Sequence, residues 1–412
     1  MTSLAFKLLD TVGPVVKKRY DDRKVWDLTF GQNKLLGWVP RRTGITGKSY
    51  EVPVTLGNVA GGSSDFASAV ANRKGTQHAR WSATRTKSYQ TATIDNETLR
   101  AMKDDKGAFF TAVTSQLDSA FRAFGSDTGW AIYKDGSGIR GTVATVSNTV
   151  LTLDAGGTRA FSLGMRCSIY DSTDTALAGT PNATDVRVIA IDRATETLTF
   201  DTDLDTVAGT VVAAVAANDV LVRAGDENAK IDGLAAAFPD PTTITTGDSF
   251  FGVDRSVYKE RLLGLHTDQS GAADFGVALR NAGAIAVENE ANPSAVFMHP
   301  LDVALLDIAL DGDREFDKVA SQDGHIGFDA IKVHLGGIVV PVLADAWCPR
   351  DTAYMLEKES LELFSIDRAP DFVSEDGDML HRLEGADEVE FRIGAYLNFL
   401  SRAPGHNVVV GL

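Results

Sequence analysis

The clearest helical pattern in the chain covers residues 106–125. Apolar side chains recur there at steps of three and four residues and so share one helix face: Phe110, Val113, Leu117, Phe121 and Phe124. Asp104 and Asp105 precede the pattern as capping residues, and Gly125 is expected to end the helix in a left-handed conformation. Such a helix is roughly 30 Å long, about the width of a small domain.

Strand patterns lie on both sides of this helix. The runs 50–56 and 81–94 are rich in β-branched and aromatic residues, and small, flexible residues separate them from Gly57 to Gly75. They predict a long two-stranded loop, which is marginal in water by itself and should therefore lie on another surface, with a partner subunit as the natural candidate. The clearest alternation is in the last long strand, whose apolar face carries Val389, Phe391, Ile393, Ala395 and Leu397.

Residues 139–225 show strand signals every 8–15 residues, between loop-like glycines at 138 and 225. The pattern predicts a small inserted β-barrel or sandwich. Its predicted core is made of Leu163, Met165, Cys167, Ile169, Val188, Ile191, Leu198 and Phe200.

Residues 226–350 return to a mixed α/β pattern. It predicts a helix over 273–288, a strand over 295–298, and a helix over 301–310 that starts after Pro300. Residues 338–343 read as a strand that contains Pro341, which is expected at a sheet edge or a bulge because proline lacks an N–H group. Strands then continue to the end of the chain.

Composition bounds the class of protein. With 412 residues, the chain should divide into two or three domains, and it contains no run of 18 apolar residues that would predict a membrane span. Its two cysteines, Cys167 and Cys348, lie far apart without metal-binding spacing, so we expect no disulfide.

Charge is distributed unevenly. Residues 1–100 hold 16 lysines and arginines against eight acidic residues, whereas the rest of the chain holds 24 against 48. A basic first part on an acidic body indicates that this part contacts something acidic. We favour the acidic body of a neighbouring copy over nucleic acid, because the basic part contains no basic run longer than Lys17–Arg19.

No catalytic or binding motif survives inspection. The glycines at 136, 138 and 141 have dinucleotide-loop spacing but precede a strand pattern, and Gly47-Lys48-Ser49 lacks the first glycine of a phosphate loop. Ser249 lies in a polar turn with no assignable histidine partner, and the seven histidines show no metal-binding spacing. We therefore expect no enzyme activity, no cofactor and no metal, and we name no site residues.

Three stretches together resemble the major capsid proteins of tailed bacteriophages, which have the Hong Kong 97-type fold. Residues 295–302 (AVFMHPLD) resemble the strand–Pro–helix step of that family, although His299 stands where asparagine is frequent. Residues 337–356 resemble its Gly–strand–Pro–Tyr hairpin, and residues 392–412 resemble its C-terminal strand and Pro–Asn tail. Each motif is weak alone, and their order along nearly the whole chain carries the resemblance.

The resemblance implies an α+β fold with a definite division of the chain. The implied parts are an N-terminal arm (1–45), an extended loop (46–94), a peripheral domain with the spine helix (95–138), an inserted β-domain (139–225), an axial domain (226–350) and C-terminal peripheral strands (351–412). Some members of the family cross-link a lysine of this loop to an asparagine of a neighbour. No motif around Lys74, Asn398 or Asn407 matches, so this chemistry is not carried over.

The resemblance also implies a structural role. Hexamers and pentamers of the protein would form an icosahedral shell around double-stranded DNA in the virion, after assembly in the host cytoplasm. The partners would be further copies of the chain and scaffold, portal or decoration proteins, with non-specific proximity to packaged DNA and no membrane contact. Alternatives are the shell of a protein nanocompartment, a phage tail or adhesion protein and, ranked last, a hydrolase that uses Ser249.

Overall fold

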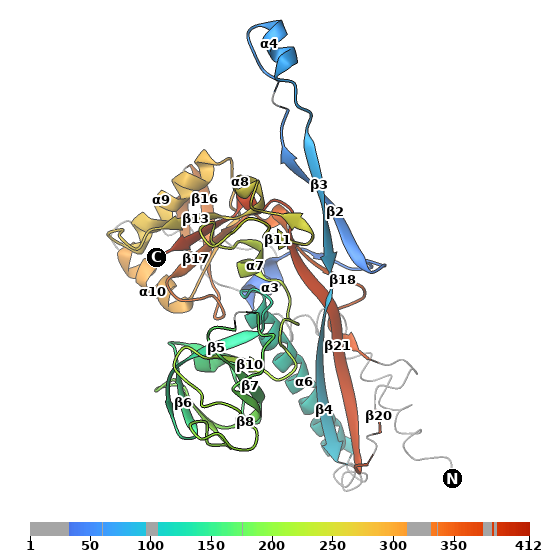
Figure 1. The fold of residues 1–412 in the computed structure, drawn as a ribbon. Helices are drawn as coiled ribbons and strands as arrows, with labels where there is room; N and C mark the ends of the chain where they lie inside the picture. The colour runs from blue at the N-terminus through green and yellow to red at the C-terminus, as the bar shows by residue number, and fades with distance from the viewer. Residues whose placement is uncertain are drawn as a thin grey trace. The chain divides into compact units, whose positions relative to one another are not determined.

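The computed structural model describes residues 33–59, 61–95, 106–174, 176–310, 331–335, 337–373, 381–382 and 385–412, with the side chains of helix α6 from Gln116 onward. The chain forms two compact units, one from the segments up to Tyr133 and from Gly233, the other from Lys134 to Asp232 (Figure 1). Residues 1–32 of the predicted arm lie outside the described residues. The last part of the arm forms helix α3 (Lys34–Trp38) and strand β1 (Arg41–Arg42).

The first unit contains a six-stranded mixed sheet. In spatial order its strands are β13 (Leu265–Asp268), β22 (Val408–Gly411), β17 (Thr352–Leu356), β14 (Ala295–Met298), β16 (Ile338–Ala344) and β15 (Ile331–Leu335). All side chains of β14 are buried, as expected for a strand inside a sheet covered on both faces. Strand β16 has neighbours on both sides, so the edge position expected for Pro341 is wrong. Strand β14 pairs only with Val342–Ala344, however, so the missing N–H group of Pro341 leaves no gap in that pairing.

Two helices pack on one face of this sheet. Helix α9 (Phe275–Glu288) starts after Asp274, whose side chain accepts a hydrogen bond from the Val277 N–H. Helix α10 (Pro300–Ala309) has Pro300 at its first position, as the sequence predicts. Both helices share one apolar core with the sheet, and Leu279 and Leu306 are fully buried in it.

Aromatic side chains from α3 and from the segment just after α6 (Lys106–Ala131) lie against the opposite face of the sheet. The ring of Trp38 is 5.2 Å from that of Phe297, and the ring of Tyr133 is 5.7 Å from that of Tyr354, between centroids. Phe297 and Tyr354 belong to adjacent strands, β14 and β17. These contacts tie segments from distant parts of the sequence to the centre of the sheet.

A buried carboxylate fixes the start of α3. Asp345 follows β16 directly and accepts hydrogen bonds from the N–H groups of Leu35 and Trp347, both at 3.0 Å. Burial raises the pKa of Asp345, while these two N–H groups act in the opposite direction. The described chain therefore begins with a segment anchored to the first sheet.

The second sheet of this unit is built on one long strand, β21 (Glu388–Ser401). The strand pairs with β4 (Thr86–Asp95), β18 (Leu361–Ser365), β19 (Asp371–Phe372) and β20 (His381–Arg382), and β18 pairs with β1. The predicted alternation of β21 is confirmed for Phe391, Ile393, Ala395 and Leu397, which are buried. Val389 is only half-buried, and Glu390, which the alternation places on the opposite face, is buried.

Helix α6 runs beside β4 and is longer than predicted (Figure 1). Leu117, Phe121 and Phe124 are buried as expected, and the rings of Phe121 and Phe372 meet edge to face at 5.6 Å. The predicted end at Gly125 is wrong, because buried residues continue the apolar face to Ala131. The side chains of Phe110 and Val113, and the predicted caps Asp104 and Asp105, lie outside the described residues.

The C-terminal part of the chain does not form one set of strands. We expected residues 351–412 to lie together in the peripheral domain. Instead, β17 and β22 complete the first sheet, whereas β18 and β21 belong to the second. The backbone pairing explains this division, since β17 pairs with β14 and β22 but with no strand of the second sheet among the described residues.

The second unit is a closed β-barrel, the architecture that the alternation predicts. Its strands follow one another as β10 (Val220–Arg223), β5 (Ile139–Ser147), β6 (Val150–Leu153), β9 (Thr197–Phe200), β8 (Ala183–Asp192) and β7 (Arg166–Tyr170). Of the predicted core, Cys167, Ile169, Val188, Leu198 and Phe200 are buried, Met165 and Ile191 are partly buried, and Leu163 is 69% exposed. Burial raises the pKa of Cys167 to about 12.

An ion cluster joins the two ends of the barrel chain. The carboxylate of Asp226 lies 3.1 Å from Arg140 Nη2 and 3.0 Å from Lys230 Nζ, and both cationic side chains are buried. Close by, Gly138 has a φ of +86°, and a Cβ atom there would lie 2.4 Å from the Asp226 carbonyl oxygen. Glycine is therefore required where the two chain ends pass each other.

We predict that the segment Lys134–Asp232 folds when expressed alone, because its core and its ion cluster are internal to it. Thermal unfolding followed by circular dichroism should show one cooperative transition. Asp226→Asn should destabilise the fragment by about 3 kcal/mol, because it leaves buried cations without their counter-charge. Asp185→Asn, which removes an exposed partner of Arg166, should cost less than about 1 kcal/mol. A fragment without a folded spectrum would contradict the prediction.

For helix α6 we predict that Ala120→Asp destabilises the first unit by about 2–4 kcal/mol, because it places an unpaired carboxylate in the core. Ala123→Asp is the matched control on the exposed side of the same helix and should cost less than about 1 kcal/mol. Denaturant unfolding of both variants measures the difference. Equal destabilisation by the two substitutions would show that this side of α6 is not part of the core.

Candidate assembly interface

Strands β2 (Ser49–Gly57) and β3 (Gln77–Thr84) form an antiparallel two-stranded ribbon with one apolar and one polar face. The register places Val52 opposite Trp81, and both side chains are buried. On the polar face, Arg80 Nε lies 2.8 Å from the carboxylate of Glu51. This alternation requires a surface that covers the apolar face.

The second strand of the ribbon continues directly into the second sheet. Strand β3 ends at Thr84, and after Arg85 the chain becomes β4, which pairs with β21. The predicted run 81–94 is thus shared by two sheets. At the crossing, the buried side chain of Asn398 donates a hydrogen bond to the Thr84 carbonyl oxygen at 2.8 Å, and Arg85 Nη1 donates to the Ile45 carbonyl oxygen at 3.2 Å.

The apolar face of the ribbon packs on its own chain. Its side chains form one core cluster with residues of the rest of the unit, namely Val253, Leu262, Phe364 and Leu400. The expectation that a partner subunit covers the ribbon is therefore wrong for the part next to the second sheet, the ribbon root (Ser49–Val54 and Ala79–Thr84). This part has an intramolecular partner because β18 and β21 present buried aromatic and aliphatic side chains to it.

A short hairpin contacts β3 at Trp81 and Ser82. This clamp hairpin consists of β11 (Ser249–Phe250) and β12 (Val253–Asp254) with the turn between them. The ring of Phe250 meets that of Trp81 edge to face at 5.9 Å, and the Phe251 carbonyl oxygen accepts a hydrogen bond from the Ser82 N–H at 2.9 Å. Just beyond the hairpin, the Tyr258 hydroxyl donates to the side chain of Gln77.

A buried carboxylate holds the other strand of the ribbon root. Glu362 of β18 accepts a hydrogen bond from Arg402 Nε at 2.8 Å, and it lies 3.8 Å from Arg42 Nε. Both arginines also donate to the hydroxyl of Tyr50 on β2, at 2.7 Å from Arg42 and 2.9 Å from Arg402. Aromatic contacts on β3 and the Tyr50 hydroxyl contacts on β2 therefore both hold the ribbon root, whose strands also pair with each other.

The opposite end of the ribbon is different. Its tip (58–76) carries the helix α4 (Phe66–Ala71), capped by the Asp65 side chain, which accepts a hydrogen bond from the Ser68 N–H at 2.9 Å (Figure 1). No residue of α4 is buried. Phe66 is 83% exposed, and Val59 and Val70 are exposed beside it in the sequence. Within the described chain, these apolar side chains are not covered.

The structure also places the motifs that the sequence analysis rejected. Gly138 leads into strand β5 rather than a helix, so it does not form a dinucleotide-binding turn. Ser249 is exposed at the start of β11, and the neighbouring Asp248 binds Arg255. In the described part of the chain, no group of three or more histidine, cysteine and acidic side chains could hold a metal ion.

Asn398 and Asn407, the candidate cross-linking asparagines, are both fully buried. The side-chain amide of Asn398 donates to the Thr84 carbonyl oxygen, and that of Asn407 donates to Ser360 Oγ at 2.9 Å. Hydrogen bonding inside the subunit therefore accounts for both amides.

Sequence reasoning located the ribbon but missed the groups that anchor it. Phe66 could have been found as the only aromatic residue in the small-residue stretch between Gly57 and Gly75. Glu362 and Arg255 carry no such signal, because single charged residues next to short strands are common.

These features together define a Hong Kong 97-like capsid fold: a spine helix beside a long strand, an extended ribbon, and an α/β sheet unit interrupted by a barrel. No protein-family model matches the chain, and no curated protein matches its sequence. A solved structure, the capsid asymmetric unit of cyanophage A-1(L), matches over 92% of both chains with a TM-score of 0.52 and 12% identity. The resemblance to phage capsid proteins that the sequence predicts is confirmed at the level of the fold.

Two further solved structures are similar with lower scores. The capsid of a native GTA particle matches 91% of this chain and 88% of its own, with a TM-score of 0.46 and 9% identity. The procapsid of satellite phage P4, determined with its size determination protein, matches 100% of this chain and 98% of its own, with a TM-score of 0.43 and 11% identity. The fold assignment rests on the cyanophage match.

Trp81 should be the main apolar anchor of the ribbon root. We predict that Trp81→Ala destabilises the first unit by about 3–5 kcal/mol, because it removes the largest fully buried side chain of this core cluster. Arg80→Ala, next in sequence but on the polar face, should cost no more than about 1 kcal/mol, the range for an exposed ion pair. Denaturant unfolding provides the measurement. Similar losses for both variants would place Trp81 outside the core.

Proposed function

We propose that the protein is a major capsid protein whose copies form hexamers and pentamers and close into an icosahedral shell around double-stranded DNA. The observation that carries this proposal is the likeness to the cyanophage capsid structure, which extends over 92% of both chains. A likeness of this extent concerns the whole subunit, not one widespread domain within it.

The ribbon supports the contact between copies. Its root is anchored in its own subunit, whereas its tip presents Phe66 and Val70 to solvent on a helix of six residues. Covering an apolar side chain stabilises a contact by about 25 cal/mol for each Å² removed from water. A tip that cannot form a core by itself gains this stabilisation on another molecule, and in a shell that molecule is the next copy.

Charge favours the same partner. The ribbon belongs to the basic first hundred residues, and Arg73 and Lys74 are exposed near its tip. The rest of the chain is strongly acidic, so the body of a second copy attracts this segment. The same negative body would repel the phosphates of enclosed DNA, which keeps a shell lining from binding its contents tightly.

The proposed location is the capsid of a virion, assembled in the host cytoplasm, with scaffold, portal or decoration proteins as further partners. In the described part of the chain, no helix combines the length and the apolar character needed to cross a lipid bilayer. A nanocompartment shell of the same fold would enclose protein cargo instead of DNA. A tail or adhesion protein would form open rings or trimers, so particle shape and nucleic-acid content distinguish the three.

We predict that the expressed protein forms closed particles and that replacing residues 61–75 by a short glycine linker abolishes them while leaving a folded subunit. The reason is that α4 contains no buried residue, so the subunit does not need the tip to fold. A neighbouring copy would need the apolar side chains of the tip for contact. Electron microscopy and sedimentation measure closure, and circular dichroism measures folding.

A point variant sharpens this test. Phe66→Ser should reduce the yield of closed particles at least tenfold, whereas Leu163→Ser, at another highly exposed apolar position on the barrel, should leave most of the yield. Normal particles from the tip replacement would show that the ribbon tip makes no essential contact. Particles that contain protein cargo and no nuclease-protected DNA would favour the nanocompartment.

A further inference from the structure

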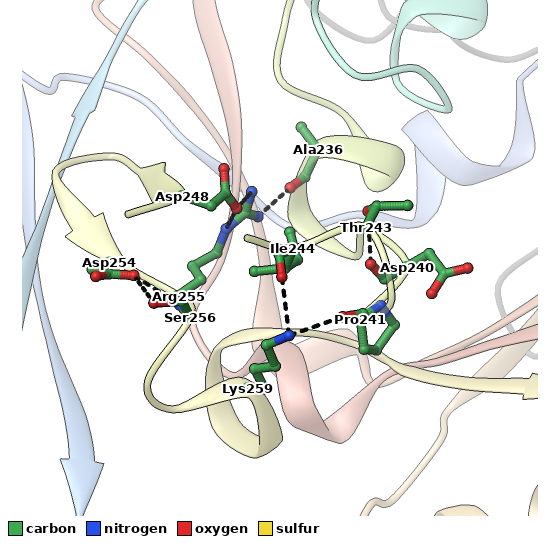
Figure 2. Close-up of polar contacts among 10 residues, drawn as sticks. All are labelled: Ala236, Asp240, Pro241, Thr243, Ile244, Asp248, Asp254, Arg255, Ser256 and Lys259. Atoms are coloured by element: carbon green, nitrogen blue, oxygen red, sulfur yellow. Dashed lines mark hydrogen bonds and ion pairs between the residues drawn. The ribbon is translucent and has the colours of Figure 1, made fainter. Parts of the chain in front are cut away.

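A buried arginine connects the clamp hairpin to the segments that precede it. Arg255 follows β12 directly and is only 6% exposed. Its guanidinium donates to the carboxylate of Asp248 through Nε at 3.2 Å and Nη2 at 3.0 Å, and to the Ala236 carbonyl oxygen of α7 (Leu234–Ala237) through Nη1 at 2.7 Å (Figure 2). It also lies over the ring of Phe250, with Cζ 4.7 Å from the centroid.

This geometry uses the properties that distinguish arginine from lysine. The planar guanidinium offers donors in a fixed fork, and here the fork joins one carboxylate and one carbonyl on different segments. The aromatic face of Phe250 adds a cation–π contact on the plane of the group. A buried charge with these partners is well satisfied, but removing it leaves the Asp248 carboxylate without its counter-charge.

A second cation fixes the loop that leads into the hairpin. Lys259, at the start of α8 (Lys259–Leu262), donates from Nζ to the carbonyl oxygens of Pro241 and Ile244, both at 3.1 Å (Figure 2). Asp240 closes a turn in the same loop by accepting a hydrogen bond from the Thr242 N–H at 2.8 Å. The segment before the clamp hairpin is therefore held at both of its ends.

The contacts of Arg255 continue to the ribbon. Phe250, which lies against the guanidinium on one side, packs on the ring of Trp81. The next residue, Phe251, accepts the hydrogen bond from the Ser82 N–H. The path from Arg255 to β3 thus passes through one aromatic ring and one backbone hydrogen bond, so the hairpin contacts β3 on the side that faces Phe250.

We propose that Arg255 is a positioning residue for assembly: it holds the clamp hairpin against β3 and thereby sets the direction in which the ribbon tip leaves the subunit. The link to assembly rests on the proposed function, whereas the effect on β3 does not. Glu362 contacts β2 through Tyr50, whereas the clamp hairpin contacts β3 directly, so the two supports act on different strands of the ribbon.

The test compares Arg255→Gln with Arg255→Lys and with Arg261→Gln. Arg261 lies nearby on α8 and is exposed. Its substitution removes the same positive charge without breaking the hydrogen bonds that Arg255 makes to Asp248 and Ala236. Hydrogen–deuterium exchange of the full-length subunit, read by mass spectrometry, compares peptides from β3 with peptides from β21. Sedimentation of the same preparations gives the yield of closed particles.

We expect Arg255→Gln to raise exchange over β3 about tenfold while exchange over β21 stays within twofold, because only the clamp contacts are weakened. Arg255→Lys should give an intermediate value, since it keeps the charge but loses the fork. Arg261→Gln should match the unmodified protein. The yield of closed particles should fall with Arg255→Gln in proportion to the change in β3.

Three results would overturn the inference. Unchanged exchange over β3 would show that Arg255 does not position the ribbon, and faster exchange over both β3 and β21 would show that it supports the whole unit. Faster exchange over β3 with normal particles would separate ribbon position from assembly. If the unmodified protein forms no particles, the proposed function fails, while the exchange comparison still decides the positioning role.

Discussion

The fold depends on one continuous stretch of extended chain that belongs to two sheets. From Gln77 to Thr84 it pairs with β2 in the ribbon, and from Thr86 to Asp95 it pairs with β21 in the second sheet. Only Arg85 separates the two pairings, so the ribbon and the second sheet share one covalent junction. The buried amide of Asn398 and the core around Trp81 lie next to this crossing. The spine helix beside β4 and the clamp hairpin beside β3 are therefore mechanically connected through one strand.

Local periodicity predicted the elements well. The apolar spacing around Leu117 and Phe121 located the spine helix, and the alternation from Phe391 to Leu397 located the long strand, because both signals depend only on neighbours in the sequence. The barrel followed from the same kind of alternation. Pairing between distant strands was not predictable, since β17 and β22 look like any short strand. Their sheet is set by the pairing of β17 with β14 and of β22 with β17. The predicted end of the spine helix at Gly125 was wrong for a similar reason, because burial beyond Gly125 depends on tertiary contacts.

The candidate interface was predicted only in outline. Small residues between two β-prone runs located a loop that cannot fold by itself, and the exposed α4 agrees with that reading. The intramolecular contacts of the ribbon root were not predicted because the partners lie far away in sequence. Arg402 donates a hydrogen bond to the Tyr50 hydroxyl, and Trp81 packs on Phe250. Anchors of this kind are single charged or aromatic residues without a repeating pattern. Their role becomes visible only when the two segments are seen together.

The chain leaves the first unit after Tyr133 and returns at Gly233, and the Leu234 N–H donates a hydrogen bond to the Ile132 carbonyl oxygen at 2.7 Å. The host chain thus closes on itself across the barrel as if in a tight turn. Closing a long loop costs little more than closing a short one, since the entropy grows only with the logarithm of loop length. The same point should therefore accept another folded domain in place of the barrel at a small entropic cost to the host unit.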